Sequence, residues 1–269
     1  MARNEERLIF AMGGGGFTME PANPLLDDFV LSLSNHPAPR ILFLPTASGD
    51  TTPQINAFRE RFVGRRCVPE HLSLFRLRET NRSLREIVLE QEILYVGGGS
   101  MRNLLAIWRA HGLDRLLVEA WRNGTVLAGL SAGAMCWFET GVTRSSGPPE
   151  PIAGLGLLEG SLTVHADGEP ERLPVWLGCV RDGRIPGGWA VDDGAGLLFR
   201  GLRMERAVSS RPGAGVQRVD ALEGELVRHR IVPELLGDGP RGVLGGRDEA
   251  VEELRRVHRM RRGAGRREF

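Results

Sequence analysis

Residues 126–137, with the sequence VLAGLSAGAMCW, constrain the fold of this chain more than any other segment. They contain the pattern Gly-x-Ser-x-Gly at 129–133, with Ser131 at its centre. The residues before the pattern are apolar and partly β-branched, as in a buried strand. Residues 132–138 are small and then bulky, as at the start of a helix. A strand, a sharp turn and a helix in this order form a nucleophile elbow, which exposes the serine hydroxyl at the tip of the turn.

Strand-like and helix-like segments alternate before this elbow. Unbroken apolar runs, most of them stopped by glycine or proline, predict strands at 7–12, 40–44, 71–77, 92–96 and 125–130. Apolar residues three and four positions apart predict helices at 23–34, 52–63, 84–90, 101–110 and 113–122. Buried strands that alternate with helices indicate an α/β fold, in which a largely parallel, flavodoxin-like sheet carries helices on both faces.

The pattern changes after about residue 141, where Gly and Pro become frequent and helical spacing fades. Short strands are predicted at 161–165, 189–193 and 196–199, and residues 204–209 and 215–219 are expected to pair as a hairpin. Residues 249–262 have the spacing of an amphipathic helix. We therefore expect one catalytic domain at 1–225, followed at 226–269 by a helical extension that packs on the same domain or frays.

Composition excludes several classes of function. All 35 basic residues are arginine, so Schiff-base lysines, pyridoxal-phosphate chemistry and a Walker A lysine are excluded. A net charge of +1 and the lack of a long apolar run argue against nucleic-acid and membrane partners. The three cysteines are far apart and form no C-x-x-C pattern, so neither a disulfide framework nor a zinc site is expected. The N-terminal residues lack the pattern of a signal peptide, and we expect a cytoplasmic protein.

A serine hydroxyl becomes a nucleophile only when a base takes its proton, and that base is usually a histidine held by a carboxylate. Among six histidines, His165 follows a short apolar strand and begins a loop, where a catalytic side chain is readily presented. The candidate acids are Asp167, Asp192 and Asp193. Asp167 is expected to point away from His165 in an extended loop. Because neighbours in a strand face opposite sides, only one acid of the 192–193 pair can face His165.

The oxyanion formed during acyl transfer needs preorganised N–H donors. Ala132, at the first position of the helix after the serine, supplies one. The glycines at 97–99 are the favoured second source, and those at 13–16 are the rival. As a dinucleotide motif the 13–16 run fails, because Thr18 or Met19 stands where G-x-G-x-x-G requires glycine. No metal or organic cofactor is expected.

With these residues identified, the chain resembles the peptidase E family, serine peptidase family S51, which includes aspartyl dipeptidases and cyanophycinases. The stretches that carry the resemblance are 13–17, 95–99, 104–108, 126–134, 155–168 and 192–194. The resemblance implies a sheet like that of the glutamine amidotransferases, with serine in place of their cysteine. It implies Ser131 as nucleophile, His165 as base and Asp193 as third member, a position that is often glutamate in relatives.

The resemblance also implies oxyanion donors from Gly98 or Gly99 and from Ala132. Relatives often carry Asn-Thr after the triple glycine, where this chain has Ser100 and Met101. Arg172 lies near the position of an arginine in dipeptidase relatives, and we expect it to pair with a substrate carboxylate. Asp192 and Ser100 are further candidates for substrate contacts.

These observations favour a serine exopeptidase that hydrolyses dipeptides with an N-terminal aspartate through an acyl-enzyme, as a monomer or homodimer. The alternatives are a cyanophycinase-like β-aspartyl peptide hydrolase and a non-catalytic binding protein of the same fold. An α/β-hydrolase esterase would order its triad serine, acid, histidine and would require His229 as the base. A glutaminase subunit is disfavoured, since its chemistry normally uses cysteine at the elbow and Cys136 lies five residues beyond Ser131.

Overall fold

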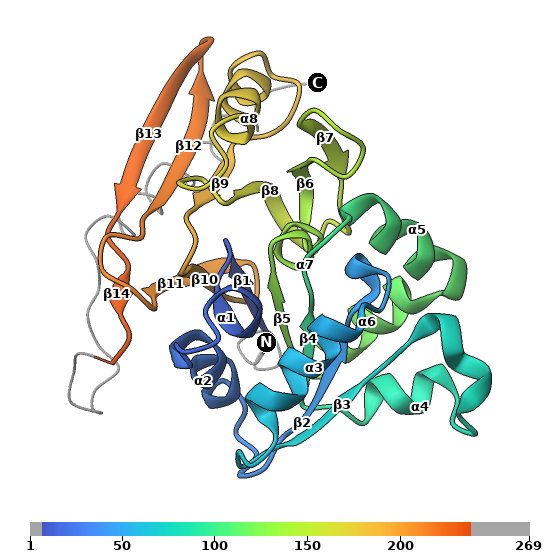
Figure 1. The fold of residues 1–269 in the computed structure, drawn as a ribbon. Coiled ribbons are helices and arrows are strands. Elements are labelled where there is room, and N and C mark those ends of the chain that lie inside the picture. Colours follow the sequence, from blue (N-terminus) through green and yellow to red (C-terminus); the bar gives the residue numbers. More distant parts are fainter. Residues whose placement is uncertain (1–6, 238–269) are drawn as a thin grey trace. The chain divides into compact units, whose positions relative to one another are not determined.

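The computed structural model describes residues 7–237, which contain two β-sheets (Figure 1). The first sheet has eight strands in the order β14-β11-β10-β1-β5-β4-β2-β3. Its parallel part consists of β1 (Leu8–Met12), β2 (Arg40–Leu44), β3 (Val68–His71), β4 (Ile93–Val96) and β5 (Val126–Leu130). Beyond β1 the sheet continues through β10 (Ala195–Arg200), which is antiparallel to β1, then β11 (Arg203–Ser209) and β14 (Glu234–Leu235).

Helices cover both faces of this sheet. On one face the aromatic side chains of α1 (Gly16–Met19), α2 (Leu25–Ser32) and α3 (Thr52–Phe62) join Phe10, Phe43 and Tyr95 in one core cluster. The strand residues that alternate with these are also buried, and that side carries α4 (Leu84–Leu89), α5 (Met101–His111) and α6 (Leu113–Arg122) (Figure 1). The predicted α/β fold with a largely parallel sheet is confirmed.

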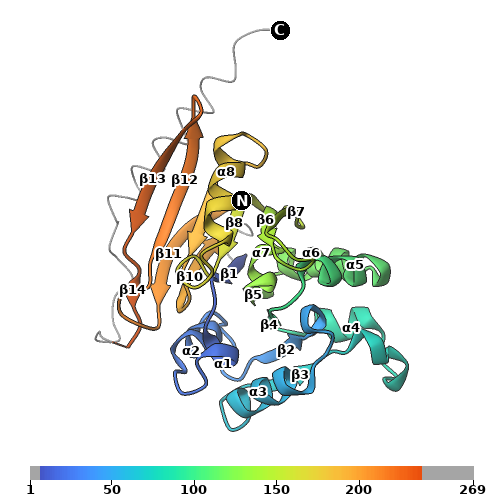
Figure 2. The same cartoon turned by 45° about the horizontal axis from the view of Figure 1, so that its top comes forward.

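A second sheet of six strands, in the order β13-β12-β9-β8-β6-β7, was not predicted from the sequence. Its strands are β6 (Phe138–Thr143), β7 (Glu150–Ala153), β8 (Leu158–Val164), β9 (Gly188–Val191), β12 (Val216–Leu222) and β13 (Glu225–Ile231). Helix α8 (Arg172–Arg181) packs against it through a cluster that includes Trp176, Val142 and Val219. Figure 2 shows α8 beside this sheet and the long β12–β13 hairpin at its edge.

The two sheets meet where β9 leads into β10. β9 belongs to the second sheet and β10 to the first, so the three residues between them, 192–194, carry the chain from one sheet to the other. Around this junction Phe199 of β10 makes edge-to-face ring contacts with Phe138 and Trp189 of the second sheet. Two of the candidate catalytic acids therefore lie at the place where the sheets are joined.

Two local predictions are wrong. The strand expected at 71–77 is instead the end of β3, followed by a 3₁₀ helix at Leu74–Glu79, and the alternation in burial stops after Leu74, since Phe75 is exposed. The hairpin expected between 204–209 and 215–219 does not form, since Val208 packs in the first core and Val219 in the second. The helix predicted to start after Ser131 does begin at Ala132, but it is short: α7 ends at Met135 and strand β6 begins at Phe138.

The predicted extension at 226–269 is described only in its first part. Residues 226–231 continue strand β13 and residues 234–235 form β14, so this part is strand where a helix was expected. The amphipathic helix predicted at 249–262 lies outside the described residues.

Candidate active site

Ser131 lies at the sharp turn between β5 and α7 (Ala132–Met135), in the strand, turn and helix order predicted. Its φ of 54° and ψ of −116° fall in a region that side chains other than glycine rarely adopt. Its N–H donates to the carbonyl oxygen of Met12 on β1 at 3.1 Å, which fixes the turn to the neighbouring strand. A methyl group on Gly129 would overlap the carbonyl of Gly133, and one on Gly133 would overlap that of Val96. Only glycine therefore allows this turn.

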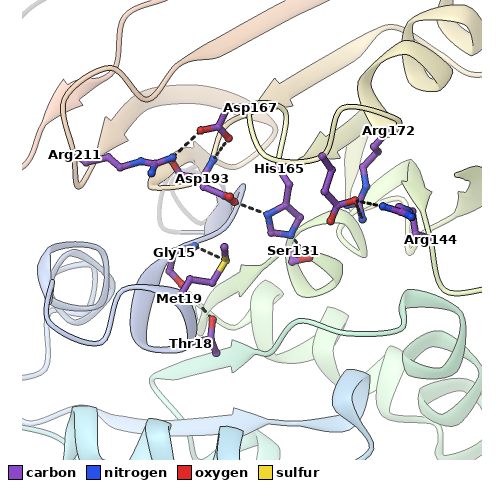
Figure 3. Close-up of polar contacts among 11 residues, drawn as sticks. Gly15, Thr18, Met19, Ser131, Arg144, His165, Asp167, Arg172, Asp193 and Arg211 are labelled. Carbon is purple, nitrogen blue, oxygen red and sulfur yellow. Dashed lines mark hydrogen bonds and ion pairs between the residues drawn. The ribbon is translucent and has the colours of Figure 1, made fainter.

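His165 follows β8 directly and also has a positive φ, 53°. Its Nε2 lies 2.9 Å from Ser131 Oγ, and its Nδ1 hydrogen-bonds Asp193 Oδ1. Figure 3 shows the three side chains in one continuous line, contributed by the elbow, the loop after β8 and the β9–β10 turn. The structure thus brings together the serine, histidine and aspartate that the sequence singled out.

Each of the three candidate acids has a different partner. Asp193 binds the imidazole of His165. Asp167 points away from that ring and accepts from the backbone N–H of Asp193 at 2.9 Å. Asp192 faces the other way and accepts from the N–H of Gly215 at 2.8 Å, and burial raises its pKa. The alternation expected for residues 192 and 193 is observed, and Asp193 is the acid that reaches the histidine.

The glycine run after β1 lies against the His165–Asp193 pair. Gly14 forms a single β-bridge with Asp193, in which the N–H of Gly194 donates to the Gly14 carbonyl at 3.1 Å. A methyl group on Gly14 would overlap Asp193 Oδ1 and lie 2.8 Å from His165 Nδ1. This role was missed at the sequence level, although a run of four glycines directly after a buried strand could have indicated a close approach of backbone to another group.

The second glycine run lies beside the nucleophile. A methyl group on Gly98 would lie 3.3 Å from Ser131 Cβ. Within residues 7–237 the N–H groups of Gly98, Gly99 and Ala132 donate to no other group. The Gly98 carbonyl accepts from Gln54 Nε2 at 3.3 Å, and Gln54 was not singled out from the sequence. Free N–H groups on two sides of a serine are what an oxyanion site requires.

Arg172 begins α8, and its side chain is only 7% exposed. Its Nη2 pairs with Glu169 at 3.0 Å, and Glu169 also lies 3.7 Å from Arg144. Among the described residues, Nε and Nη1 of Arg172 are buried without a hydrogen-bond acceptor. Burial lowers the pKa of the guanidinium, while the charges of Glu169 and Asp193 oppose that effect. A buried cation with two unused donors can bind an anionic ligand.

The remaining candidates have structural partners. Ser100 caps α5, where its Oγ accepts from the N–H of Asn103 at 3.2 Å. His229, which an α/β-hydrolase triad would need, is on edge strand β13, and the histidine bonded to Ser131 is His165. Cys136 is buried, which raises the pKa of its thiol, and its Sγ contacts the Gly133 carbonyl.

The part of the chain from 7 to 237 contains no group of three or more His, Cys, Asp or Glu side chains placed to hold a metal ion. None of its helices combines the length and the apolar character needed to cross a membrane.

Comparison with known proteins finds peptidases. The sequence profile of peptidase family S51 matches residues 9–207. A protein of Bacillus subtilis (strain 168), described as the uncharacterized peptidase YgaJ, is 47% identical over 229 residues, which cover 85% of this chain and 99% of that protein.

Two solved structures share the fold at lower identity. A peptidase from an acI-B1 Actinobacterium superposes with a TM-score of 0.65 at 19% identity, over 84% of this chain and 94% of that one. A candidate peptidase E from Listeria monocytogenes EGD-e superposes with a TM-score of 0.53 at 17% identity, over 76% and 98% of the two chains.

Proposed function

Because the chain belongs to peptidase family S51, we propose that it is a serine-type exopeptidase that hydrolyses small peptides, above all dipeptides with an N-terminal aspartate. One observation carries the proposal. An unbroken line of hydrogen bonds runs from Ser131 at a nucleophile elbow through His165 to Asp193. The incompletely paired guanidinium of Arg172, whose pKa the charge of Asp193 raises, supports the preference for an acidic substrate.

The geometry supports acyl transfer in two steps. A carboxylate only accepts, so Nδ1 of His165 carries the proton that Asp193 binds and Nε2 is the free base. Nε2 takes the proton of Ser131 Oγ, 2.9 Å away, as Oγ attacks the scissile carbonyl carbon. The imidazolium gives that proton to the leaving amine, the C–N bond breaks, and an ester on Ser131 remains. Water, deprotonated by the same Nε2, then attacks the ester carbonyl carbon. The imidazolium returns the proton to Ser131 Oγ as the C–O bond breaks, and the acid product leaves.

The oxyanion of each tetrahedral intermediate is assigned to backbone donors. Ala132 N–H lies at the positive end of α7, and the 97–99 loop supplies the second donor from Gly98 or Gly99. Gln54 holds the carbonyl of Gly98, and in a trans peptide the N–H of Gly99 points the opposite way. Gln54 thereby fixes the direction of one candidate donor.

Arg172 accounts for the acidic preference. Keeping a guanidinium out of water is costly unless its donors are used, and Glu169 uses only part of them. The side-chain carboxylate of an N-terminal aspartate would complete the pairing with two parallel hydrogen bonds. A β-aspartyl peptide also presents a carboxylate next to its scissile bond. A cyanophycinase-like hydrolase is therefore the second candidate that the same residue supports.

Hydrolysis of Asp-Leu, Glu-Leu, Ala-Leu and a β-aspartyl-arginine dipeptide tests this function. We expect wild-type protein to prefer Asp-Leu, and Ser131→Ala to lose about 10⁴-fold or more in kcat. We expect Arg172→Gln to reduce hydrolysis of Asp-Leu much more than that of Ala-Leu. The matched control is Glu169→Gln with Arg172→Gln, which removes both charges of the pair and so leaves no unbalanced charge on Glu169.

Other results would contradict parts of the proposed function. Turnover of the β-aspartyl substrate alone would support the second candidate. An equal loss on every substrate in Arg172→Gln would mean that this arginine supports the fold and not specificity. Undiminished turnover in Ser131→Ala would exclude the serine mechanism. Tight peptide binding without any turnover would indicate a binding protein.

A further inference from the structure

Asp193 lies in the turn that carries the chain from one sheet to the other, and its position decides where His165 points. We propose that Asp167 and Arg211 together form a clamp on the backbone of Asp193, and so act as positioning residues for the acid and base of the reaction. The proposal rests on the proposed serine mechanism.

The clamp is a closed ring of hydrogen bonds (Figure 3). The N–H of Asp193 donates to Asp167 Oδ1 at 2.9 Å, and its carbonyl accepts from Arg211 Nε at 3.0 Å. Arg211 Nη2 closes the ring by pairing with Asp167 Oδ2 at 2.7 Å. Both polar groups of the Asp193 main chain are therefore bound by side chains from other loops.

Without the clamp these two backbone groups would lose their partners. The β-bridge to Gly14 uses the N–H of the next residue, Gly194, and leaves the N–H and carbonyl of Asp193 on the other side. In the described chain, Asp167 and Arg211 provide the only hydrogen bonds to them. If the main chain at Asp193 could rotate, its carboxylate would turn away from His165.

The clamp also joins three loops of the site. Asp167 lies two residues after His165, Asp193 lies between β9 and β10, and Arg211 lies between β11 and β12. The side chains of Arg211 and Asp167 are 43% and 36% exposed, and ion pairs this exposed contribute little to stability. The role that suits this pair is to hold geometry.

Charge gives the clamp a second signature. The His165 ring pairs with Asp193, whose backbone binds Asp167 and Arg211. The other charged groups that interact with these are Asp192, Arg172 and Glu169. Asp167→Asn keeps an oxygen acceptor for the Asp193 N–H but leaves Arg211 as an unbalanced cation. Arg211→Gln leaves Asp167 as an unbalanced anion. The two changes should move the imidazole titration of His165 in opposite directions, and the double variant should restore it.

The experiment compares Asp167→Ala, Asp167→Asn, Arg211→Gln and the double Asp167→Asn with Arg211→Gln in the full-length protein. The control is Arg40→Gln, which breaks a similarly exposed pair, with Glu90 at 2.8 Å, at the start of strand β2. For Asp167→Ala we expect kcat on Asp-Leu to fall about 10- to 100-fold with KM changed less than about twofold. Asp167→Asn should retain most of kcat. The melting temperature of each variant should fall no further than that of the Arg40→Gln control.

NMR titration of His165 in substrate-free protein, assigned by its loss in His165→Gln, supplies the second readout. We expect a shift of a few tenths of a pH unit to lower pH in Asp167→Asn and to higher pH in Arg211→Gln. Wild-type kcat in Asp167→Ala, a change confined to KM, or shifts in the same direction would each overturn the clamp. Because the titration needs no substrate, it tests the clamp even if the peptide panel overturns the proposed function.

Discussion

Ser131 and Asp193 lie at the two ends of one line of hydrogen bonds, and different kinds of contact hold them. Ser131 is fixed by backbone and by small residues: its N–H binds the carbonyl of Met12, and Gly129 packs on the carbonyl of Gly133. Asp193 is fixed by charged side chains from distant loops. The proposed nucleophile is thus held by the fold itself, while the proposed acid is positioned by tertiary contacts at its edge.

This difference predicts that the same chemical change will have different consequences at the two ends. A methyl group added at the nucleophile end meets backbone, which cannot move alone. At Gly14, beside the acid, it meets the side-chain tips of Asp193 and His165, which can rotate away. Damage to the elbow should therefore appear as lost stability, and damage to the acid end as lost activity in a protein that still folds.

The largest effect is expected for Gly129→Ala. Its methyl group would overlap the carbonyl group of Gly133 and lie 3.0 Å from Ala134 N, so α7 would have to move away from β5. Overpacking against backbone in a core strand should reduce the free energy of unfolding by about 3 kcal/mol or more, with loss of activity. Chemical denaturation monitored by circular dichroism measures this change.

A Gly129→Ala protein with wild-type stability and no activity would contradict this expectation, because the geometry of the elbow could then change without loss of folding stability.

The same distinction, between local backbone structure and tertiary contacts, separates the features that could be predicted from the sequence from those that could not. Strands β1, β2, β4 and β5 of the first sheet were predicted because each is a largely apolar run, and the elbow was predicted because strand, turn and helix are encoded within twelve residues. His165 was singled out by its position at the start of a loop after an apolar strand, and Asp193 was chosen over Asp192 through the resemblance to a family. The elements that were not predicted lack a clear local pattern: helix α8 contains Pro174 and Gly178, and strand β13 is largely exposed.

The supporting residues could not be found in this way. Arg211 is 44 residues from Asp167, and no spacing in a sequence signals that one will pair with the other across two loops. Gln54 likewise acts through a backbone carbonyl 44 residues away. The Arg211–Asp167 contact depends on how the two sheets are joined, because Arg211 lies between a strand of the first sheet and a strand of the second. The second sheet was the part of the fold that local patterns did not predict.

A smaller effect, and one that depends on pH, is expected beneath the acid end. Asp27 is fully buried under the 13–17 segment, where it accepts from Tyr95 at 3.1 Å, pairs with Arg61 at 3.0 Å and binds the N–H of Phe17. Burial raises the pKa of this carboxyl from 3.8 to about 6. The folded protein therefore holds this proton more tightly than the unfolded chain does.

The sign of the effect follows from this order. The contribution of Asp27 to stability is fully present below pH 3.8 and is lost as pH rises through about 6. A shift of about two units corresponds to about 3 kcal/mol as an upper value. Denaturant unfolding of wild type and Asp27→Asn at pH 4 and pH 6.5 measures it. We expect the wild type to lose more stability over this interval than the variant, and parallel curves would contradict the assignment.

The smallest effect on stability is expected for Gly14→Ala, the counterpart of Gly129→Ala at the acid end. Its methyl group would meet the carboxylate of Asp193 and the imidazole of His165, and both can rotate away at a cost of about 1 kcal/mol. Rotation breaks the alignment with Ser131, so kcat should fall about 10- to 100-fold.

The control for Gly14→Ala is Gly178→Ala, at a position of α8 where an added methyl group meets nothing within 4 Å. It should leave kcat unchanged and stabilise the helix by about 0.5–1 kcal/mol. Stopped assays on Asp-Leu measure kcat, and thermal melts measure stability, for Gly14→Ala, Gly129→Ala and Gly178→Ala. If Gly14→Ala lost stability as severely as Gly129→Ala, the acid end would be as much part of the fold as the elbow. The division between backbone-held nucleophile and side-chain-held acid would then be wrong.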